Sequence, residues 1–209
     1  MTDADLSTND LAAAEAAAPS RKRPKPGERR VQILQALATM LEQPGADRIT
    51  TAALAARLEV SEAALYRHFA SKAQMFEGLI EFIEQSVFTL INQITEREAP
   101  GSGQAARIVA MLVQFAEKNP GMTRVMVGDA LVYENERLQQ RMNQFFDKVE
   151  ASLKQCLRGE GDGATPTLEA QVRASMLTAF VVGRLQRFAR SGFKRTPSEH
   201  LDASLARML

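Results

Sequence analysis

This 209-residue chain is poor in cysteine, histidine and tryptophan. The sequence has one cysteine, two histidines and no tryptophan, and only 6% of its residues are aromatic. One cysteine cannot form an internal disulfide bond, which is typical of a reducing compartment. No spacing of Asp, Glu and His indicates a metal site, and no nucleophile lies beside a base, so an all-α enzyme is the least favoured function class and no cofactor is expected. Glu134, Glu136 and Asp147 are expected on a solvated face.

The chain also lacks long hydrophobic runs and a large net charge. No apolar segment approaches the roughly 20 residues that span a bilayer. The N-terminus has neither the basic start nor the apolar core of a signal peptide, so we expect a cytoplasmic protein. The net charge of +1 does not by itself indicate a partner.

Charge is instead concentrated near the N-terminus. Residues 1–20 hold four acids and no Lys or Arg, whereas residues 21–30, RKRPKPGERR, hold six Lys or Arg and one Glu. An acidic, alanine-rich tail that leads into a basic arm interrupted by proline is typical of disorder. We therefore predict that residues 1–27 form a disordered acidic tail and a basic arm that attracts anions.

Beyond the arm, apolar residues recur with the period of an α-helix and period-2 alternation is nearly absent, which predicts an all-α fold. Residues 28–72 are expected to form a small three-helix head, and residues 73–209 a larger helical body. The predicted helices cover residues 28–42, 50–58, 61–70, 72–98, 105–118, 122–132, 135–158, 168–191 and 197–209.

The segment VSEAALYRHF, which begins at Val60, predicts a helix with two distinct faces. Leu65 and Phe69 are four residues apart and share the face that anchors the segment to a core. Ala63, Tyr66 and Arg67 fall on the opposite face. Alanine can meet a thymine methyl group, and arginine can bind phosphate or the edge of a guanine. Together with the helix that precedes it, this segment predicts a helix-turn-helix that binds DNA.

Other predicted DNA contacts surround this helix. Hydroxyl and backbone N–H groups at a helix N-terminus attract phosphate, Tyr66 and His68 can donate to phosphate oxygens, and Lys72 begins the next helix beside the same surface. The basic arm is placed to reach a minor groove or the backbone. The predicted DNA-binding residues are Arg23, Lys25, Arg29, Thr50, Thr51, Ser61, Ala63, Tyr66, Arg67, His68 and Lys72.

The stretch TTAALAARLEVSEAALYRHFASKAQMF resembles the helix-turn-helix of TetR-type regulators. That resemblance implies a TetR-like homodimer with one DNA-reading head in each subunit. One position departs from the pattern, because Glu59 stands where these turns usually carry glycine before Val-Ser. If the turn requires a positive φ, a glutamate there costs about 1 kcal/mol. It also places a negative charge near DNA.

Further segments, among them MFEGLIEFIE, FAEKNPGMTR, ERLQQRMNQFF and FKRTP, resemble the SlmA family of nucleoid occlusion factors over roughly residues 28–209. This resemblance implies a nucleoid-associated inhibitor of cell division. Such proteins bind palindromic chromosomal sites, as one or more dimers per site, and while on DNA bind the C-terminal tail of FtsZ and antagonise assembly of the division ring. The alternative is a TetR-type transcriptional repressor released by a small ligand, which predicts a ligand cavity in the body.

The resemblance places the FtsZ tail between the predicted helices 72–98 and 105–118. With Ile83 at the centre of the apolar stripe of helix 72–98, Phe82 and Phe88 lie roughly 100° and 140° away, where they either line a docking groove or are covered by neighbouring helices. Leu90 falls on the predicted core stripe itself. The positions that match the family's FtsZ site are Phe82, Leu90, Met111, Gln114, Lys118 and Asn119.

The predicted helix 168–191 mixes small and large apolar residues, which suits close packing between helices. We predict that it forms a four-helix dimer interface together with residues 135–158 and 197–209. An isologous dimer would match a palindromic site. Alternatively, the small residues serve packing within one chain. The predicted interface residues are Ala174, Leu177, Phe180, Val181, Gly183, Leu185 and Phe188.

Overall fold

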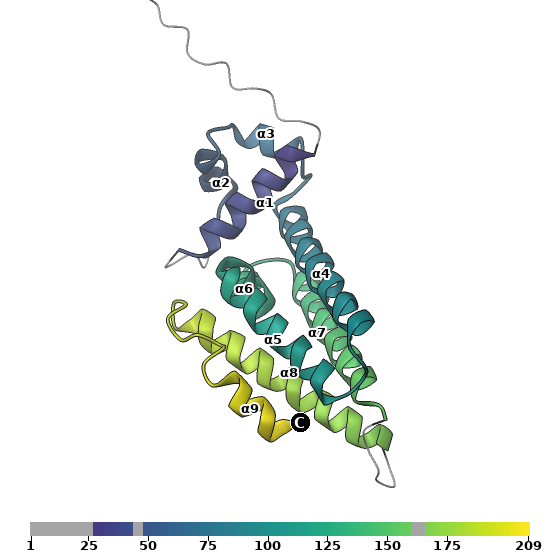
Figure 1. The fold of residues 1–209 in the computed structure, drawn as a ribbon. Helices are drawn as coiled ribbons and strands as arrows, with labels where there is room; N and C mark the ends of the chain where they lie inside the picture. The colour runs from purple at the N-terminus through teal and green to yellow at the C-terminus, as the bar shows by residue number, and fades with distance from the viewer. Residues whose placement is uncertain (1–26, 44–47, 160–165) are drawn as a thin grey trace, which may run out of the picture.

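A small helical head stands at one end of a larger helical body (Figure 1). The computed structural model describes residues 27–43, 48–159 and 166–209, and every regular element within these ranges is a helix. The all-α prediction is therefore confirmed. The predicted tail and nearly all of the basic arm, with Arg23 and Lys25, lie outside the described residues. The head contains α1 (Glu28–Leu41), α2 (Thr51–Arg57) and α3 (Glu62–Tyr66).

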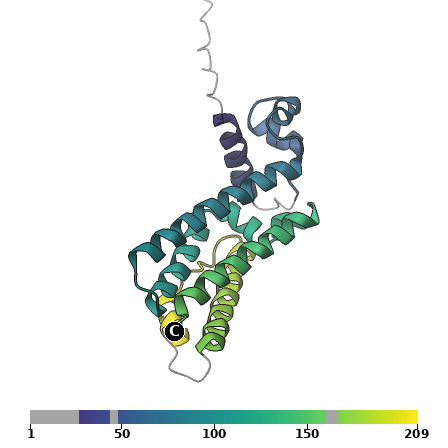
Figure 2. The ribbon, with the colours of Figure 1, turned by 90° about the vertical axis from the view of Figure 1, so that its right-hand side faces the viewer.

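The body is organised around α5, which contacts α4, α6, α7 and α8. Its apolar face is completely buried, with Ile108, Val109 and Leu112 at 0% exposure. Figure 2 shows α4 and α7 as the two long helices that run away from the head. The body helices are α4 (Lys72–Arg97), α5 (Ser102–Lys118), α6 (Pro120–Met126), the 3₁₀ helix η1 (Asp129–Leu131), α7 (Glu136–Leu157), α8 (Pro166–Arg190) and α9 (Leu201–Met208).

Two predicted helix boundaries were wrong for local reasons. The predicted helix 122–132 is split into α6 and η1, because Gly128 adopts a left-handed conformation with φ 83°. The last helix begins at Leu201 and not at residue 197, because His200 also has a positive φ and breaks the helical path before it. Both breaks depend on single backbone angles that hydrophobic periodicity does not report.

The predicted core stripe of α4 is correct except at Leu90. Ile83 and Val87 are 0% exposed, whereas Leu90 is 36% exposed. Phe88 is partly buried, and its ring packs edge-on against Phe145 of α7 with the ring centroids 5.6 Å apart. Of the two aromatic side chains in question, Phe88 is therefore covered by a neighbouring helix, while Phe82 remains exposed.

Ion pairs fasten the first turns of α7 to α4. Arg141 donates to both carboxylate oxygens of Glu84, with Nη2–Oε2 and Nε–Oε1 distances of 2.5 and 3.3 Å. This hydrogen bonding raises the pKa of Arg141 above its ordinary value. One turn earlier, Arg137 pairs with Glu77. A guanidinium that donates two hydrogen bonds to one carboxylate fixes the relative orientation of the two groups as well as stabilising them. These pairs therefore help to set how α7 lies along α4.

The head meets the body where α1 packs against α6. Gly121 lies so close to α1 that a Cβ atom there would be 1.9 Å from the carbonyl oxygen of Ala38. No side chain other than hydrogen fits this gap, because the obstacle is backbone and cannot rotate away. The position of the head on the body thus depends on a glycine in the sequence NPGMTR.

The turn between α2 and α3 does place a positive φ at Glu59, the condition under which the sequence predicts a cost. Glu59 has φ 54°, a left-handed conformation that glycine adopts without steric cost. The turn is closed by the backbone N–H of Val60, which donates to the carbonyl of Ala55 at 3.0 Å. The chain therefore holds a glutamate in a conformation that costs a non-glycine residue about 1 kcal/mol.

We predict that Gly121→Ala destabilises the protein by about 3 kcal/mol, because the new methyl group forces α1 away from α6. Urea unfolding measures the change. Gly103→Ala is the matched control, since a Cβ there meets nothing within 4 Å and alanine favours the helix by about 0.5–1 kcal/mol. Equal stability of the two variants would contradict the close contact.

We predict that Glu59→Gly stabilises the head by about 1 kcal/mol, because it relieves the positive φ. The readout is the urea midpoint of unfolding. Glu81→Gly, at an exposed helical position of α4, should instead destabilise by about 1 kcal/mol. A loss of stability in both variants would show that the turn is not strained at Glu59.

Candidate nucleic-acid interface and partner groove

The outer face of α3 presents the three side chains that the sequence places there. Ser61 caps the helix, with its Oγ accepting from the backbone N–H of Ala64 at 3.3 Å. Leu65 on the inner face is buried, as is Phe69 just beyond the helix, each at 1% exposure. On the opposite side, the side chains of Ala63, Tyr66 and Arg67 are exposed. The geometry of a DNA-reading surface is therefore present, while contact with DNA stays a prediction.

The threonines at the start of α2 have structural partners within the head. The Thr50 hydroxyl oxygen caps α2 by accepting from the backbone N–H of Ala53 at 3.1 Å. Thr51 donates its hydroxyl to the carboxylate of Glu62 in α3 at 2.6 Å. Thr50 keeps a hydroxyl proton for a phosphate, whereas Thr51 would have to release Glu62 first. The Thr51–Glu62 contact also ties the two helices of the motif together.

Arg30 clamps the end of α3 to α1, a role that sequence reasoning missed. Its Nη1 donates to the backbone carbonyl of His68 at 2.5 Å, and its guanidinium lies 4.1 Å from the centroid of the Phe69 ring. The Arg30 guanidinium is stabilised by a cation–π interaction with the ring and by a hydrogen bond to a carbonyl just after the helix. The neighbouring Arg29, predicted to bind DNA, donates to Gln32 on its own helix at 2.9 Å.

Lys72, another predicted DNA contact, is held by the body. Its Nζ lies 2.5 Å from Oε1 of Glu134, and the two side chains are 27% and 10% exposed. The expectation that Glu134 lies on a solvated face was therefore wrong. Its partner comes from 62 residues earlier in the chain, a separation that local sequence patterns cannot reveal.

A groove lies between the C-terminal half of α4 and α5, with a volume of about 260 Å³. Its lining includes Leu90, Met111 and Gln114, three of the six predicted FtsZ-binding residues. The complete lining is Leu90, Gln93, Ile94, Arg97, Glu98, Arg107, Ala110, Met111 and Gln114.

The other three predicted FtsZ-binding residues lie outside this lining. Phe82 and Lys118 are exposed, whereas Asn119 donates its side-chain amide to the carbonyl of Phe115 at 2.7 Å. α5 follows α4 after a short loop, and the two helices pack together. The part of Phe82, Lys118 and Asn119 in binding FtsZ stays a prediction.

Most of the predicted dimer interface is buried inside the chain. Five of the seven residues are at most 4% exposed and have almost no surface left for a second subunit; they are Ala174, Leu177, Val181, Leu185 and Phe188. These five side chains pack within one chain, as the alternative expects of the small Ala174, and their place in a dimer interface stays a prediction. Phe180 and Gly183 keep part of their surface. The large apolar residues that α8 exposes are Leu168, Val172 and Met176.

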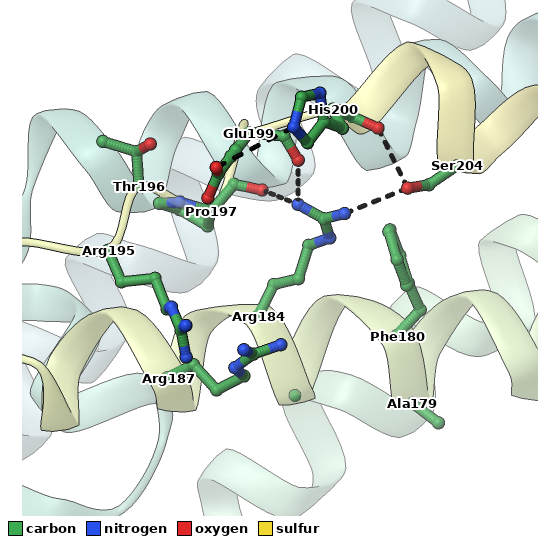
Figure 3. Close-up of a pocket in the computed structure, with 11 residues that line it drawn as sticks. Ala179, Phe180, Arg184, Arg187, Arg195, Thr196, Pro197, Glu199, His200 and Ser204 are labelled. Carbon is green, nitrogen blue, oxygen red and sulfur yellow. Dashed lines mark hydrogen bonds and ion pairs between the residues drawn. The ribbon is translucent and has the colours of Figure 1, made fainter.

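Phe180 and Gly183 line a second cavity of about 570 Å³ between α8 and the segment that leads into α9 (Figure 3). Arg184 crosses this cavity and donates to the carbonyls of Pro197 and Glu199 at 2.8 and 2.6 Å. Its guanidinium also lies 4.5 Å from the centroid of the Phe180 ring. The role of Arg184 is thus to tie the C-terminal segment onto α8.

The described residues contain neither a candidate metal site nor a candidate membrane-spanning helix. Within them, no group of three or more His, Cys, Asp or Glu side chains is close enough to hold a metal ion. None of their helices combines the length and the apolar composition needed to cross a bilayer. Cys156 is buried, and that burial raises the pKa of its thiol.

Two family profiles match the head and the body separately. Residues 33–79 match the profile of bacterial regulatory proteins of the tetR family. Residues 104–208, half of the chain, match the profile of the SlmA-like, tetracyclin repressor-like C-terminal domain. The first match covers the helix-turn-helix and the start of α4, and the second covers the groove-lining α5 and the rest of the body.

Solved structures confirm the fold without indicating a function. The TetR transcriptional regulator from Legionella pneumophila has a TM-score of 0.70 at 14% identity, over 90% of this chain and 100% of that one. The fatty acid degradation regulator FadR from Bacillus halodurans has a TM-score of 0.72 at 13% identity, over 89% of this chain and 97% of that one.

Similarity to curated proteins is much higher. The nucleoid occlusion factor SlmA of Idiomarina loihiensis is 50% identical over 177 residues, which cover 84% of this chain and 90% of that protein. The same factor of Shewanella pealeana is 51% identical, over 83% of this chain and 89% of that protein. Together with the matching body profile, this similarity shows that the chain belongs to the SlmA family of nucleoid occlusion factors, built on the TetR fold.

Proposed function

We propose that this nucleoid occlusion factor holds palindromic chromosomal DNA and the C-terminal tail of FtsZ at the same time. The observation that carries the proposal is that both candidate sites are joined by α4 without overlapping. Lys72 begins α4 beside the head, and Leu90 lies in the groove 18 residues later, about 27 Å along the helix axis. A bound DNA and a bound peptide therefore do not compete for space.

The head reads DNA through the outer face of α3. Ala63 lets the helix approach the bases, Arg67 supplies a forked cation, and Tyr66 supplies a phosphate donor. Contacts of this kind place the protein on the chromosome, so it is a nucleoid-associated protein of the cytoplasm. Its role is to bind and not to catalyse a reaction.

The protein acts as a homodimer whose interface includes the outer face of α8. Leu168, Val172 and Met176 are exposed at intervals of four residues and so form one apolar stripe along this helix. Exposed apolar residues on one helix face are typical of a helix that packs against a second subunit. A two-fold axis through such an interface places two heads on the two halves of a palindrome.

The groove between α4 and α5 suits a peptide with apolar and acidic side chains. Leu90, Ile94 and Met111 supply its apolar surface. Arg97 and Arg107 add positive charge at the end away from the head, where Arg107 also pairs with Glu98 at 3.1 Å. Lys118 adds a cation toward the other end. A groove that buries an apolar side chain of the peptide and carries cations at both ends binds an acidic tail through burial and through charge.

The ligand-gated repressor is not proposed as a second function. The interior of the bundle around α5 is filled by aliphatic side chains, among them Leu153 and Leu177 at 0% exposure. The larger cavity beside α9 is crossed by Arg184 and bordered by Arg187 and Arg195. Membership of the SlmA family favours the bridging function.

We predict that Ala63→Leu weakens binding to palindromic DNA about tenfold, because the longer side chain keeps α3 out of the groove. Tyr66→Ala should weaken binding to palindromic and random DNA by the same factor, since a phosphate contact does not read sequence. Fluorescence anisotropy at one fixed salt concentration measures both effects. Ala151→Leu, at an exposed position of α7, is the control. Unchanged affinity in both head variants would exclude α3 as the reading helix.

We predict that Lys118→Glu weakens binding of an FtsZ C-terminal tail peptide about fivefold and leaves DNA binding unchanged, because it reverses a charge at the groove. Lys148→Glu makes the same charge change at an exposed position of α7 and should affect neither ligand. Anisotropy of a labelled peptide is the assay. If Lys118→Glu reduced peptide and DNA binding equally, the groove would not be the FtsZ site.

A further inference from the structure

Lys72 is rigidly placed at the junction between the head and the body. Ser71 caps α4, with its Oγ accepting from the backbone N–H of Gln74 at 3.2 Å, so that Lys72 is the first residue of the helix. Its ammonium group lies 5.7 Å from the centroid of the Phe76 ring, one turn further along. The backbone of Lys72 is thus fixed at the edge of the DNA-reading surface, and only its long side chain can move between partners.

Glu134 supplies that partner from the segment between η1 and α7. The adjacent Val132 and Tyr133 are 69% and 70% exposed, so this segment protrudes from the body. The Glu134 carboxylate turns inward instead, is 10% exposed, and lies 2.5 Å from the Lys72 ammonium. The charge of a carboxylate that is largely buried is stabilised by its cation. Removal of the cation leaves a negative charge that water solvates poorly, which costs free energy.

We propose that Glu134 sets the DNA affinity of this protein by competing with a DNA phosphate for Lys72. The proposal rests on the DNA-binding function proposed above. An ammonium group on a flexible four-carbon stem can reach either anion but acts as one point charge. When Lys72 turns to a phosphate, Glu134 loses its partner, and the free energy of that loss opposes DNA binding.

The competition is local, because other contacts hold the beginning of α7 in place. Arg137 pairs with Glu77, and Arg141 with Glu84, through contacts that involve neither Lys72 nor Glu134. Leu138 is buried at 1% exposure on the same side of α7. Release of Lys72 therefore changes the head surface without detaching α7 from α4.

The test measures the affinity of the full-length protein for labelled palindromic DNA at one fixed ionic strength. Glu134→Gln should tighten DNA binding about fivefold. DNA binding then no longer has to break an ion pair, and such a pair changes an equilibrium constant by somewhat less than a factor of ten. In a Lys72→Gln background, Glu134→Gln should change nothing, because no cation remains to be released. Glu136→Gln removes the same charge two residues away at an exposed position and should leave the affinity within about twofold.

Four results would overturn the proposal. Weaker binding by Glu134→Gln would mean that the carboxylate positions Lys72 for DNA. Equal tightening by Glu136→Gln, or tightening that persists in the Lys72→Gln background, would mean a general charge effect. Unchanged affinity of Glu134→Gln would show that Lys72 is not shared. A wild-type protein that did not bind DNA would overturn the proposed function as well, whereas the other results leave that function intact.

Discussion

One continuous helix of 26 residues, α4, fixes the relation between the two ends of this protein. Its first turn borders the DNA-reading head, and its last turns line the groove against α5. A buried stripe that includes Ile83 and Val87 holds it in the core, while Glu77 and Glu84 fasten it to α7. Because a helix packed in this way is stiff, the head and the groove keep a constant separation, which a bridge between two ligands requires.

The head is attached to this rigid body through close contacts. The backbones of α1 and α6 approach so closely at Gly121 that only glycine fits. The same α1 carries Arg30, which holds the end of α3 through the carbonyl of His68. Contacts thus connect α3 to α1 and α1 to the body, so the orientation of α3 depends on Arg30 and Gly121.

Features set by neighbouring residues could be predicted from the sequence. The two faces of α3, the buried stripe of α4 and the positive φ of Glu59 all follow from local spacing or from a turn pattern. Phe82 was also correctly placed off the core stripe. The pattern failed at Leu90, because a helix surrounded on several sides has no single boundary between buried and exposed positions.

Features that depend on distant residues could not be predicted. The partner of Glu134 is 62 residues away, and the clamp at Arg30 joins positions 38 residues apart. In α8 the mixture of small and large apolar residues indicated close packing correctly. It could not show that Leu177 and Val181 face the chain's own core while Val172 and Met176 face outward, because both faces of this helix are apolar.

Simultaneous binding of DNA and the FtsZ tail is what the proposed function requires. Its most direct test is the anisotropy of a labelled FtsZ C-terminal tail peptide, titrated with the full-length protein in the absence and presence of saturating palindromic DNA. Two sites about 27 Å apart on one helix predict saturable peptide binding that persists or tightens when DNA is bound. Displacement of the peptide by DNA, or no peptide binding while DNA binding is intact, would contradict the bridge.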